Sequence, residues 1–295
     1  WQSKMLQILR PRSLGFVSRC FSSPTASTVT YRVKNPQDRT EFLKARPPRD
    51  LHIYDFSHTL TDYSVAWRWQ QQLMQQRIRK IDKDDRDLLL LVQHPCVYTL
   101  GRKATEDDLK FPPGAYEVHK IERGGEVTHH CPGQLVGYPI LDLGNYKKDC
   151  HWYLRRLEEV IMNVLKLYGL SGRRDGEYTG VWVGNSKVAA IGVNVSKWTT
   201  MHGFALNVEC DLSGFDRIVP CGIDHSHLGV TSMRQLLLDR GSPLANEIKL
   251  SIVKEQILHN FAKIFNVDVN KVRFTSGCPV TPGAQVDQDS KLCGS

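Results

Sequence analysis

The sequence predicts an α/β (α+β) domain in which a mixed β-sheet is flanked by helices. Three segments repeat apolar residues at the three- and four-residue steps of amphipathic helices. Between them lie six short runs of apolar and β-branched residues, which are typical of strands. Because helices and strands alternate irregularly along the chain, the pattern favours a mixed sheet over a regular βαβ repeat.

The predicted elements follow one another from about residue 51 onward. The expected helices cover residues 63–81, after a capping Thr61-Asp62 pair, residues 154–168, ended by Gly169, and residues 248–265. The expected strands cover residues 87–93, 96–101, 135–143, 180–184, 187–195 and 203–208. Gly184-Asn185-Ser186 separates two of these strands and is typical of a hairpin turn. The composition, 41% hydrophobic and 24% charged, is that of a soluble globular protein, and no run approaches the ~20 apolar residues of a membrane span.

The net charge of +8 belongs to the N-terminal segment. Of 39 basic and 31 acidic residues, ten and two lie within residues 1–49, which leaves 29 of each sign elsewhere. The charge therefore gives no reason to expect a nucleic-acid partner. Residues 5–37 contain no acidic residue and intersperse Arg with Ser and aliphatic residues, as mitochondrial presequences do. We expect a presequence and linker for the mitochondrial matrix in 1–49, a folded domain in 50–274 and a disordered tail in 275–295. A disordered basic tail is the alternative for the leader.

His129, His130 and Cys131 form a run of three potential metal ligands between turn-forming residues. Successive side chains of an extended segment point to opposite sides, so these three cannot all reach one ion. Further ligands would have to come from elsewhere, such as Cys150-His151 or Cys221-x3-His225, and no recognisable zinc-ligand spacing occurs. We therefore expect no metal site.

Glycines bracket the same loop, with Gly124-Gly125 before it and Pro132-Gly133 after it. Glycine lets the backbone adopt a positive φ and approach a ligand closely. One interpretation is a phosphate cradle, although neither GxxxxGK[ST] nor GxGxxG is present. The other is a tight turn between strands, and the glycines alone leave both open.

Cys221 lies in the Pro-Cys-Gly turn of FDRIVPCGI rather than in an apolar run. A thiol on a tight turn is presented outward, whereas a buried structural thiol usually lies on a strand or helix face, where we place Cys96. A reactive cysteine also needs a group that favours the thiolate, because a free thiol has a pKa near ~8.5. Lys187, which opens an apolar strand, is a candidate for that group. Taken singly, a structural Cys221 and a solvent-facing Lys187 are equally good interpretations.

Five blocks follow one another along the chain: HPCVYTLGR, RGGEVTHHCPGQLVGYPILDL, GVWVGNSKVAAIGVNV, MHGFALNV and FDRIVPCGI. In order and spacing they resemble the blocks of lipoyl(octanoyl) transferases, whose signatures include RGG-x-x-T-x-H-x-PGQ-x-x-x-YP and HPx-YT-x-G. The resemblance covers roughly residues 50–270. Two positions depart from it, because the family usually has an aromatic residue where His129 stands and a glycine where Cys131 stands.

This resemblance implies a fold like that of biotin and lipoate ligases, and it implies roles for particular residues. Cys221 matches the nucleophile that carries the acyl group as a thioester, and Lys187 matches the lysine that lowers the pKa of that thiol. The substrate-binding positions implied are Arg123, Gly124, Gly125, Glu126, Val127, Thr128, His129, His130, Ala190, Ile191, Gly192, Gly203, Phe204 and Ala205. His130 is then expected to face the pocket, and no metal, nucleotide or other cofactor is required.

The function that the resemblance implies is mitochondrial octanoyl transfer, the first step of protein lipoylation. The implied donor is octanoyl-acyl carrier protein. The implied acceptors are lysines of lipoyl domains in 2-oxoacid dehydrogenase subunits and of the glycine cleavage H protein, with no nucleic acid and no membrane involved. Since acyl carrier proteins are acidic, the basic pairs Arg102-Lys103 and Arg173-Arg174 are the candidates for docking.

Two other functions stay open at this point. An ATP-dependent lipoate or biotin ligase of the same fold activates its acid as an adenylate and needs no cysteine at the position of Cys221. A requirement for ATP would reveal such a ligase. A non-catalytic acyl-protein-binding module would keep the pocket without turnover, and a turnover assay separates it from an enzyme. The joint presence of Cys221 and Lys187 favours the transferase.

Overall fold

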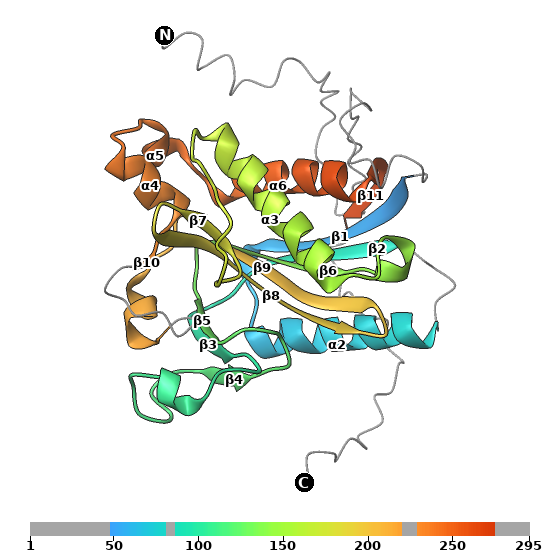
Figure 1. Cartoon of the computed structure of the whole chain (residues 1–295), viewed down its shortest axis with the longest axis horizontal. Helices are drawn as coiled ribbons and strands as arrows, with labels where there is room; N and C mark the ends of the chain where they lie inside the picture. The colour runs from blue at the N-terminus through green and yellow to red at the C-terminus, as the bar shows by residue number, and fades with distance from the viewer. Residues whose placement is uncertain (1–47, 81–85, 220–228, 275–295) are drawn as a thin grey trace, which may run out of the picture.

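A mixed β-sheet forms the middle layer of the structure (Figure 1), a computed structural model that describes residues 48–80, 86–219 and 229–274. Its eight strands in these ranges have the order β10-β8-β9-β6-β2-β1-β11, with β7 paired to β8. They are β1 (Arg49–Leu60), β2 (Asp87–Gln93), β6 (Gln134–Ile140), β7 (Val181–Val183), β8 (Ser186–Ser196), β9 (Thr199–Asn207), β10 (Gly229–Val230) and β11 (Val267–Phe274). The β1–β2, β1–β11 and β8–β10 pairs are parallel and the other pairs antiparallel, which confirms the predicted mixed sheet.

Helices cover both faces of this sheet. Helices α3 and α6 lie on one face and α2 lies on the other, together with a second, three-stranded sheet (Figure 1). The helices are α2 (Tyr63–Arg79), α3 (Cys150–Leu167), α4 (Met233–Asp239), α5 (Leu244–Glu247) and α6 (Leu250–Phe265), with 3₁₀ turns η2 (Glu106–Asp108), η3 (Leu143–Asn145) and η4 (Ser213–Arg217). The small sheet has the order β4-β3-β5, formed by β4 (Val118–Lys120), β3 (Val97–Leu100) and β5 (Val127–His130).

The apolar run of β2 explains why the sheet has helices on both sides. Successive side chains of a strand point to opposite faces. Leu89 and Leu91 pack in the core that α3 and α6 form with the sheet, whereas Leu90 and Val92 pack in the core on the α2 side. All four side chains are fully buried. A strand covered on both faces therefore has an unbroken apolar sequence rather than an alternating one.

The predicted helices are all present, with ends set by local hydrogen bonding. Helix α3 begins four residues earlier than predicted, because the Asp149 carboxylate accepts a hydrogen bond from Trp152 N at 3.0 Å and caps it. It ends before Gly169, whose φ of 70° favours glycine. Asp62 occupies the N-cap position of α2 but makes no side-chain capping bond, so that detail of the prediction was wrong.

The six predicted strands correspond to β2, β3, β6, β7, β8 and β9, and the predicted hairpin joins β7 to β8. Strand β1 was not predicted, because polar residues interrupt its sequence RDLHIYDFSHTL. Only Leu51, Ile53 and Ser57 of β1 are buried. Strands β4, β5 and β10 were missed because they span only two to four residues. Strand β11, at the end of the domain, was missed because polar residues interrupt its sequence, as in β1.

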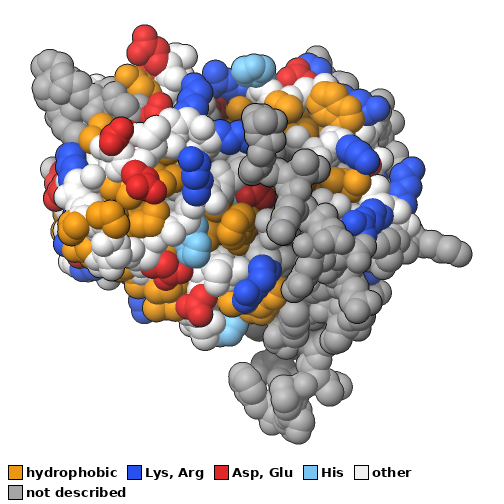
Figure 2. Space-filling view, turned by 90° about the horizontal axis from the view of Figure 1, so that it is seen from below, with side chains coloured by type: hydrophobic (Ala, Val, Ile, Leu, Met, Phe, Trp, Pro, Cys, Tyr) orange, Lys and Arg blue, Asp and Glu red, His pale blue; other side chains and the backbone are white. Residues whose placement is uncertain are grey.

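The predicted leader and tail lie almost wholly outside the described residues, which begin at position 48 and end at 274. Within the described ranges, no helix combines the length and apolar character needed to cross a membrane. On the face seen in Figure 2, basic and acidic side chains are interspersed, as the balanced charges of residues 50–295 lead one to expect.

Candidate functional site

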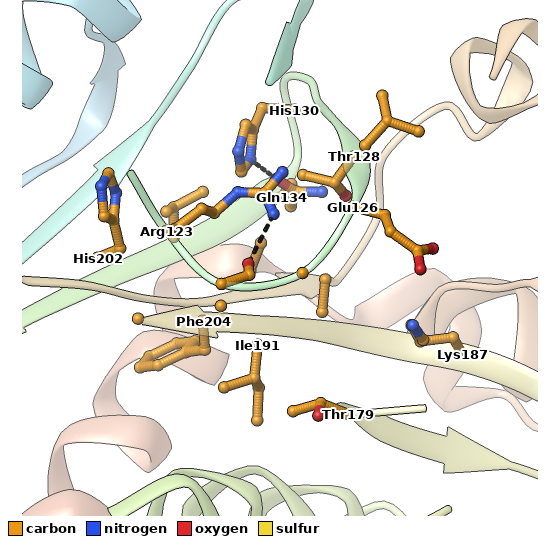
Figure 3. Close-up of a pocket in the computed structure, with 18 of the residues that line it drawn as sticks. Arg123, Glu126, Thr128, His130, Gln134, Thr179, Lys187, Ile191, His202 and Phe204 are labelled. Carbon is orange, nitrogen blue, oxygen red and sulfur yellow. Dashed lines mark hydrogen bonds between the residues drawn. The ribbon is translucent and has the colours of Figure 1, made fainter. Parts of the chain in front are cut away.

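A pocket lies between strands β8 and β9 of the large sheet and the segment 123–130, which ends in β5 (Figure 3). Of the predicted site residues, those that line it are Arg123, Gly124, Gly125, Glu126, Val127, Thr128, His130, Lys187, Ala190, Ile191, Gly192, Gly203, Phe204 and Ala205. The segments 190–192 and 203–205 meet because β8 and β9 are antiparallel neighbours, with Ala190 opposite Ala205 and Gly192 opposite Gly203. The structure thus brings three segments that are distant in sequence around one cavity.

Arg123 anchors the wall of the pocket formed by the loop before β5. Its Nη2 donates hydrogen bonds to the Thr99 carbonyl oxygen at 2.7 Å and to Thr99 Oγ1 at 2.9 Å, and its Nη1 donates to the Gly124 carbonyl oxygen at 3.1 Å. The Gly124 N–H donates to the Val193 carbonyl oxygen of β8 at 2.9 Å. The loop is therefore fixed to both sheets, and it holds the pocket open between them.

Glycine is required at two positions beside this loop. Gly125 has a φ of 86°, a backbone conformation that a side chain would strain. Gly192 lies directly below the loop, where a Cβ would come within 2.9 Å of the Gly124 carbonyl oxygen. Gly125 therefore serves the turn conformation of the loop, in line with the tight-turn interpretation, and Gly192 serves its close packing on β8.

His130 points to one side of β5, and His129 and Cys131 point to the other, where the two side chains form a hydrogen bond. The His129 ring lies 4.6 Å from the Tyr98 ring and 5.4 Å from that of Phe215, on the side of β5 away from the cavity. His129 is therefore the one predicted binding residue that does not line the pocket, because neighbouring residues on a strand face opposite ways. No cluster of three or more His, Cys, Asp or Glu residues suited to a metal ion occurs in the described ranges.

His130 faces the pocket and belongs to a chain of buried hydrogen bonds. Gln134 Nε2 donates to Asn207 Oδ1 at 2.9 Å, which orients the amide so that its Oε1 accepts from His130 Nδ1 at 2.7 Å (Figure 3). Burial lowers the pKa of His130 well below its ordinary value of 6.5, so the ring is neutral. With the proton fixed on Nδ1, the lone pair of Nε2 is available as a hydrogen-bond acceptor.

Sequence reasoning missed several polar residues that also line the pocket, namely Tyr63, Gln134, Tyr138, His202 and Asn207. His202 has a φ of 59°, and its ring nitrogens have no hydrogen-bond partner within the described structure. Its Nε2 lies 3.8 Å from Glu122 Oε2. His202 stands in the quoted block MHGFALNV, and Gln134 in the PGQ turn, so the motifs themselves held a signal. Tyr63 offered none, because its spacing is that of a helix core.

Burial of a second histidine, His94, predicts a loss of stability in mild acid. Its Nδ1 donates to the Thr61 carbonyl oxygen at 2.6 Å, its Nε2 accepts from the Tyr138 hydroxyl at 2.8 Å, and burial lowers its pKa to about 4. Between pH 6.5 and 4 the unfolded chain binds a proton here that the folded chain does not. The free energy of unfolding should therefore decrease as the pH is lowered from 6.5 to 4, by up to about 3 kcal/mol.

Urea unfolding midpoints measured from pH 7 to pH 4 would test this. His94→Gln should reduce the dependence of stability on pH, leaving the part that comes from buried His130, while lowering stability overall. The exposed His151 provides the control, since His151→Gln should keep the wild-type slope. An unchanged slope in His94→Gln would show that another group governs acid stability.

Lys187 enters the pocket from the start of β8 (Figure 3). Only 6% of its surface is exposed, which is unusual for lysine, so the solvent-facing interpretation of this residue was wrong. The segment around Lys187 is held between two neighbours, because Lys187 pairs with Trp182 of β7 and with Val230 of β10. An ammonium group held in a partly apolar cavity favours a negative charge beside it.

The predicted nucleophile, Cys221, lies outside the described residues. The described chain stops at Val219 and resumes at Gly229, whose N–H donates to the Asn185 carbonyl oxygen and which pairs with Ser186, next to Lys187. Among the described thiols, Cys131 is buried, and a hydrogen bond with the Cys210 thiol, together with burial, raises its pKa. Cys96 is exposed at a bend before β3, so its predicted place on a buried strand face was wrong.

The fold is shared with solved lipoate-protein ligases. Lipoate-protein ligase A bound with ATP aligns over 78% of this chain and 88% of that protein, with a TM-score of 0.55 and 14% sequence identity. The protein Ta0514 of T. acidophilum with bound lipoic acid aligns over 80% and 90%, with a TM-score of 0.60 and 14% identity. At this identity the likeness defines the class of fold, that of lipoate-protein ligases, and not the reaction.

The chain belongs to the lipoyl protein ligase A/B catalytic domain family, whose model matches residues 62–272. An octanoyltransferase of Nostoc punctiforme is 53% identical over 189 residues, which cover 63% of this chain and 81% of that protein. A second, from Nostoc sp., is 45% identical over 77% of this chain and 98% of its own length. A chloroplastic octanoyltransferase of Arabidopsis thaliana is 44% identical over 83% and 87%.

Proposed function

We propose that this protein transfers an octanoyl group from acyl carrier protein to a lysine of a lipoyl domain, through a thioester on Cys221. The protein is an acyltransferase of protein lipoylation, as its octanoyltransferase relatives indicate. The observation that carries the proposal is the 53% identity of this chain to an octanoyltransferase. Its pocket also combines apolar lining residues with the buried Lys187.

The pocket is suited to a medium-length acyl chain. Its floor is formed by small or apolar residues of adjacent strands, including Val136, Ile191, Phe204 and Ala205. In Figure 3 the Lys187 ammonium lies at one end of this floor and His202 at the other. A carbonyl carbon held near Lys187 would place the alkyl tail along the floor, where burial stabilises it by about 0.8 kcal/mol per methylene.

The proposed reaction has two steps, each balanced in bonds and protons. The Cys221 thiolate attacks the donor thioester, the carbonyl–sulfur bond to phosphopantetheine breaks, and the released thiolate takes up a proton. The neutral amine of the acceptor lysine then attacks the enzyme thioester, loses a proton, and expels the Cys221 thiolate. Exchange between thioesters is nearly isoenergetic, and conversion of a thioester to an amide runs downhill, so no nucleotide is needed to drive the reaction.

Donor docking is proposed at Arg102 and Lys103. Both are exposed, Lys103 lines the pocket, and Arg102 donates a hydrogen bond to Asn194 of β8 at 2.6 Å. The other predicted pair is less available, because Arg173 forms an ion pair with Asp175 at 2.9 Å and Arg174 forms one with Glu158 at 2.8 Å. A single basic pair at the mouth would steer an acidic carrier without requiring a positively charged domain.

The acceptors are lipoyl-domain proteins. A solved lipoylation system of Thermoplasma acidophilum pairs a bipartite lipoate protein ligase with its E2 lipoyl domain, and that ligase shares this fold with a TM-score of 0.50. We propose lipoyl domains of 2-oxoacid dehydrogenase subunits and the glycine cleavage H protein as the acceptors here.

Replacing His130 should impair transfer more than replacing either neighbour. In His130→Ala the hydrogen bond to Gln134 is lost and the pocket wall loses a buried ring, so we expect a decrease in kcat/KM of about 10²-fold. His129→Ala and Cys131→Gly should retain most activity, because those side chains point away from the cavity. Steady-state transfer assays on the three variants check this. Equal losses in all three would mean that the loop matters for folding rather than for the site.

We further propose that the leader directs the protein to the mitochondrial matrix. The support is the acid-free, Arg- and Ser-rich segment 5–37. Residues 5–49 fused to a fluorescent reporter should enter mitochondria and be shortened near Phe21-Ser22, and deletion of the first 45 residues should leave activity intact. Because one relative is chloroplastic, the same fusion should be tried in plant cells, where import into plastids would contradict the proposal.

The experiment that tests the proposed function is a transfer assay without nucleotide. Purified protein, octanoyl-acyl carrier protein and apo lipoyl domain should give octanoylated lipoyl domain, detected by mass spectrometry, at a rate that ATP does not raise. The ligase alternative predicts the reverse, with free octanoate and ATP required and acyl carrier protein unused. A module without turnover would bind the donor and give no product with either substrate set.

A further inference from the structure

The largest fully buried side chain of the described structure, Trp182, stands beside Lys187. Trp182 has 0% exposure and lies on β7, paired with Lys187 of β8 in the antiparallel hairpin. Its indole Nε1 donates a hydrogen bond to the Tyr178 carbonyl oxygen at 3.2 Å, which fixes the ring plane. The ring is therefore an oriented surface rather than mobile core packing.

The Lys187 ammonium lies over this ring. Lys187 Nζ is 5.0 Å from the ring centroid, within the range in which the negative face of indole attracts a cation. The aliphatic stem of Lys187 passes close to Gly180, where an added Cβ would lie 3.4 Å from both Cδ and Cε. Gly180 also has a φ of 137°, and an added Cβ would lie 2.6 Å from the Ala189 carbonyl oxygen, so glycine lets the chain before β7 pack closely against β8 beside the lysine.

Other charged groups surround the pair. The guanidinium carbon of Arg173 lies 5.9 Å from the same ring, but Arg173 also pairs with Asp175. Glu126 and Glu177 line the pocket together with Lys187, and neither lies within ion-pair distance of it in the described structure. The Trp182 ring is thus an oriented contact of the ammonium, and the attraction of its negative face fixes where Nζ lies.

We propose that Trp182 is a positioning residue for the transfer reaction, which holds Lys187 as an oriented ammonium through a cation–π contact. This inference rests on the proposed function, in which Lys187 stabilises the thiolate of Cys221. Loss of the ring's negative potential, with its shape retained, should reduce the thiolate fraction of Cys221. The reactive thiol would then ionise at a higher pH.

Fluorinated tryptophans test this without truncating a buried side chain, because fluorine withdraws electron density from the ring and changes its size little. Mono-, di-, tri- and tetrafluorotryptophan would be placed at position 182 of the full chain by nonsense suppression. Alkylation of Cys221 by iodoacetamide would be followed against pH by peptide mass spectrometry. We expect the rate near pH 7 to fall stepwise along the series, by about 3- to 30-fold in total, and its pH midpoint to rise.

Trp152 provides the matched control, since its ring lies 5.8 Å from the Arg156 guanidinium carbon on α3, away from the pocket. The same analogues at position 152 should leave the Cys221 profile unchanged. Trp182→Phe should retain more alkylation than Trp182→Leu, with melting temperatures recorded for both.

A flat series at position 182 would overturn the role of Trp182, whatever the stability of the substituted proteins. The proposed function is judged separately from the unsubstituted protein. If that protein forms no octanoyl-Cys221, the proposed mechanism has failed. If it does form the thioester and the series is flat, only the inference about Trp182 has failed.

Discussion

Cys221→Ala should lose octanoyl transfer almost completely, with a decrease in kcat/KM on the order of 10⁴- to 10⁶-fold. Without the thiol there is no covalent carrier for the acyl group. The acceptor lysine could then attack only the donor thioester itself, without the enzyme thioester as an intermediate. The same variant should take up no octanoyl group from the donor. Steady-state transfer assays and donor-only labelling measure the two losses independently.

Two exposed thiols provide controls for this variant. Cys96→Ala and Cys150→Ala remove free cysteines that lie outside the pocket lining, and both variants should transfer at the wild-type rate. Folding of Cys221→Ala is checked by its melting temperature. Transfer at an undiminished rate by well-folded Cys221→Ala would mean that the donor thioester is attacked directly.

The second large effect is expected for Lys187→Ala. Removal of the ammonium leaves the thiol to ionise unaided, so the pH midpoint of acylation should rise toward the ordinary thiol value of ~8.5. Each pH unit of that rise lowers the thiolate fraction at neutral pH by about tenfold, and we expect a loss of about 10- to 100-fold in the acylation rate near pH 7. Raising the pH should restore much of the rate. Rapid-quench acylation measured across pH checks both parts.

Lys187→Arg should not rescue this loss. The site is buried, and a planar guanidinium cannot occupy the space of a compact ammonium held between the Trp182 ring and the pocket. A pH profile of Lys187→Ala identical to that of the wild type, with only the maximum rate lowered, would show that Lys187 positions substrate and does not stabilise the thiolate.

Much of the fold could be predicted from the sequence, because the spacing of apolar residues indicates which faces of the helices and strands are buried. The run DLLLLVQ indicated a strand, and the structure buries its alternate leucines in two separate cores. Strand β1 was not predicted because it is defined by its pairing with β2 and β11 on either side and has no regular apolar pattern. Pairing partners that distant in sequence leave no local signal.

The site was predictable where a motif and a strand period agreed. Alternation along β5 separates His130, which faces the pocket, from His129, which packs against Tyr98. The contact between Lys187 and Trp182 could not be predicted in the same way, because it depends on the register of the β7–β8 hairpin, which contains an irregularity next to Trp182. His202 stands in the block MHGFALNV, which was a signal, but its place in an otherwise apolar strand does not by itself distinguish a pocket residue from a core residue.

The central claim, that the acyl group passes through Cys221, is tested most directly by the mass of the enzyme itself. The full chain would be mixed with octanoyl-acyl carrier protein and no acceptor, then analysed intact and after proteolysis. We predict a single octanoyl adduct on the peptide that contains Cys221, labile to neutral hydroxylamine as a thioester is, and discharged when apo lipoyl domain is added. An octanoyl group on any other residue, or product formation with no adduct at any time, would contradict the account.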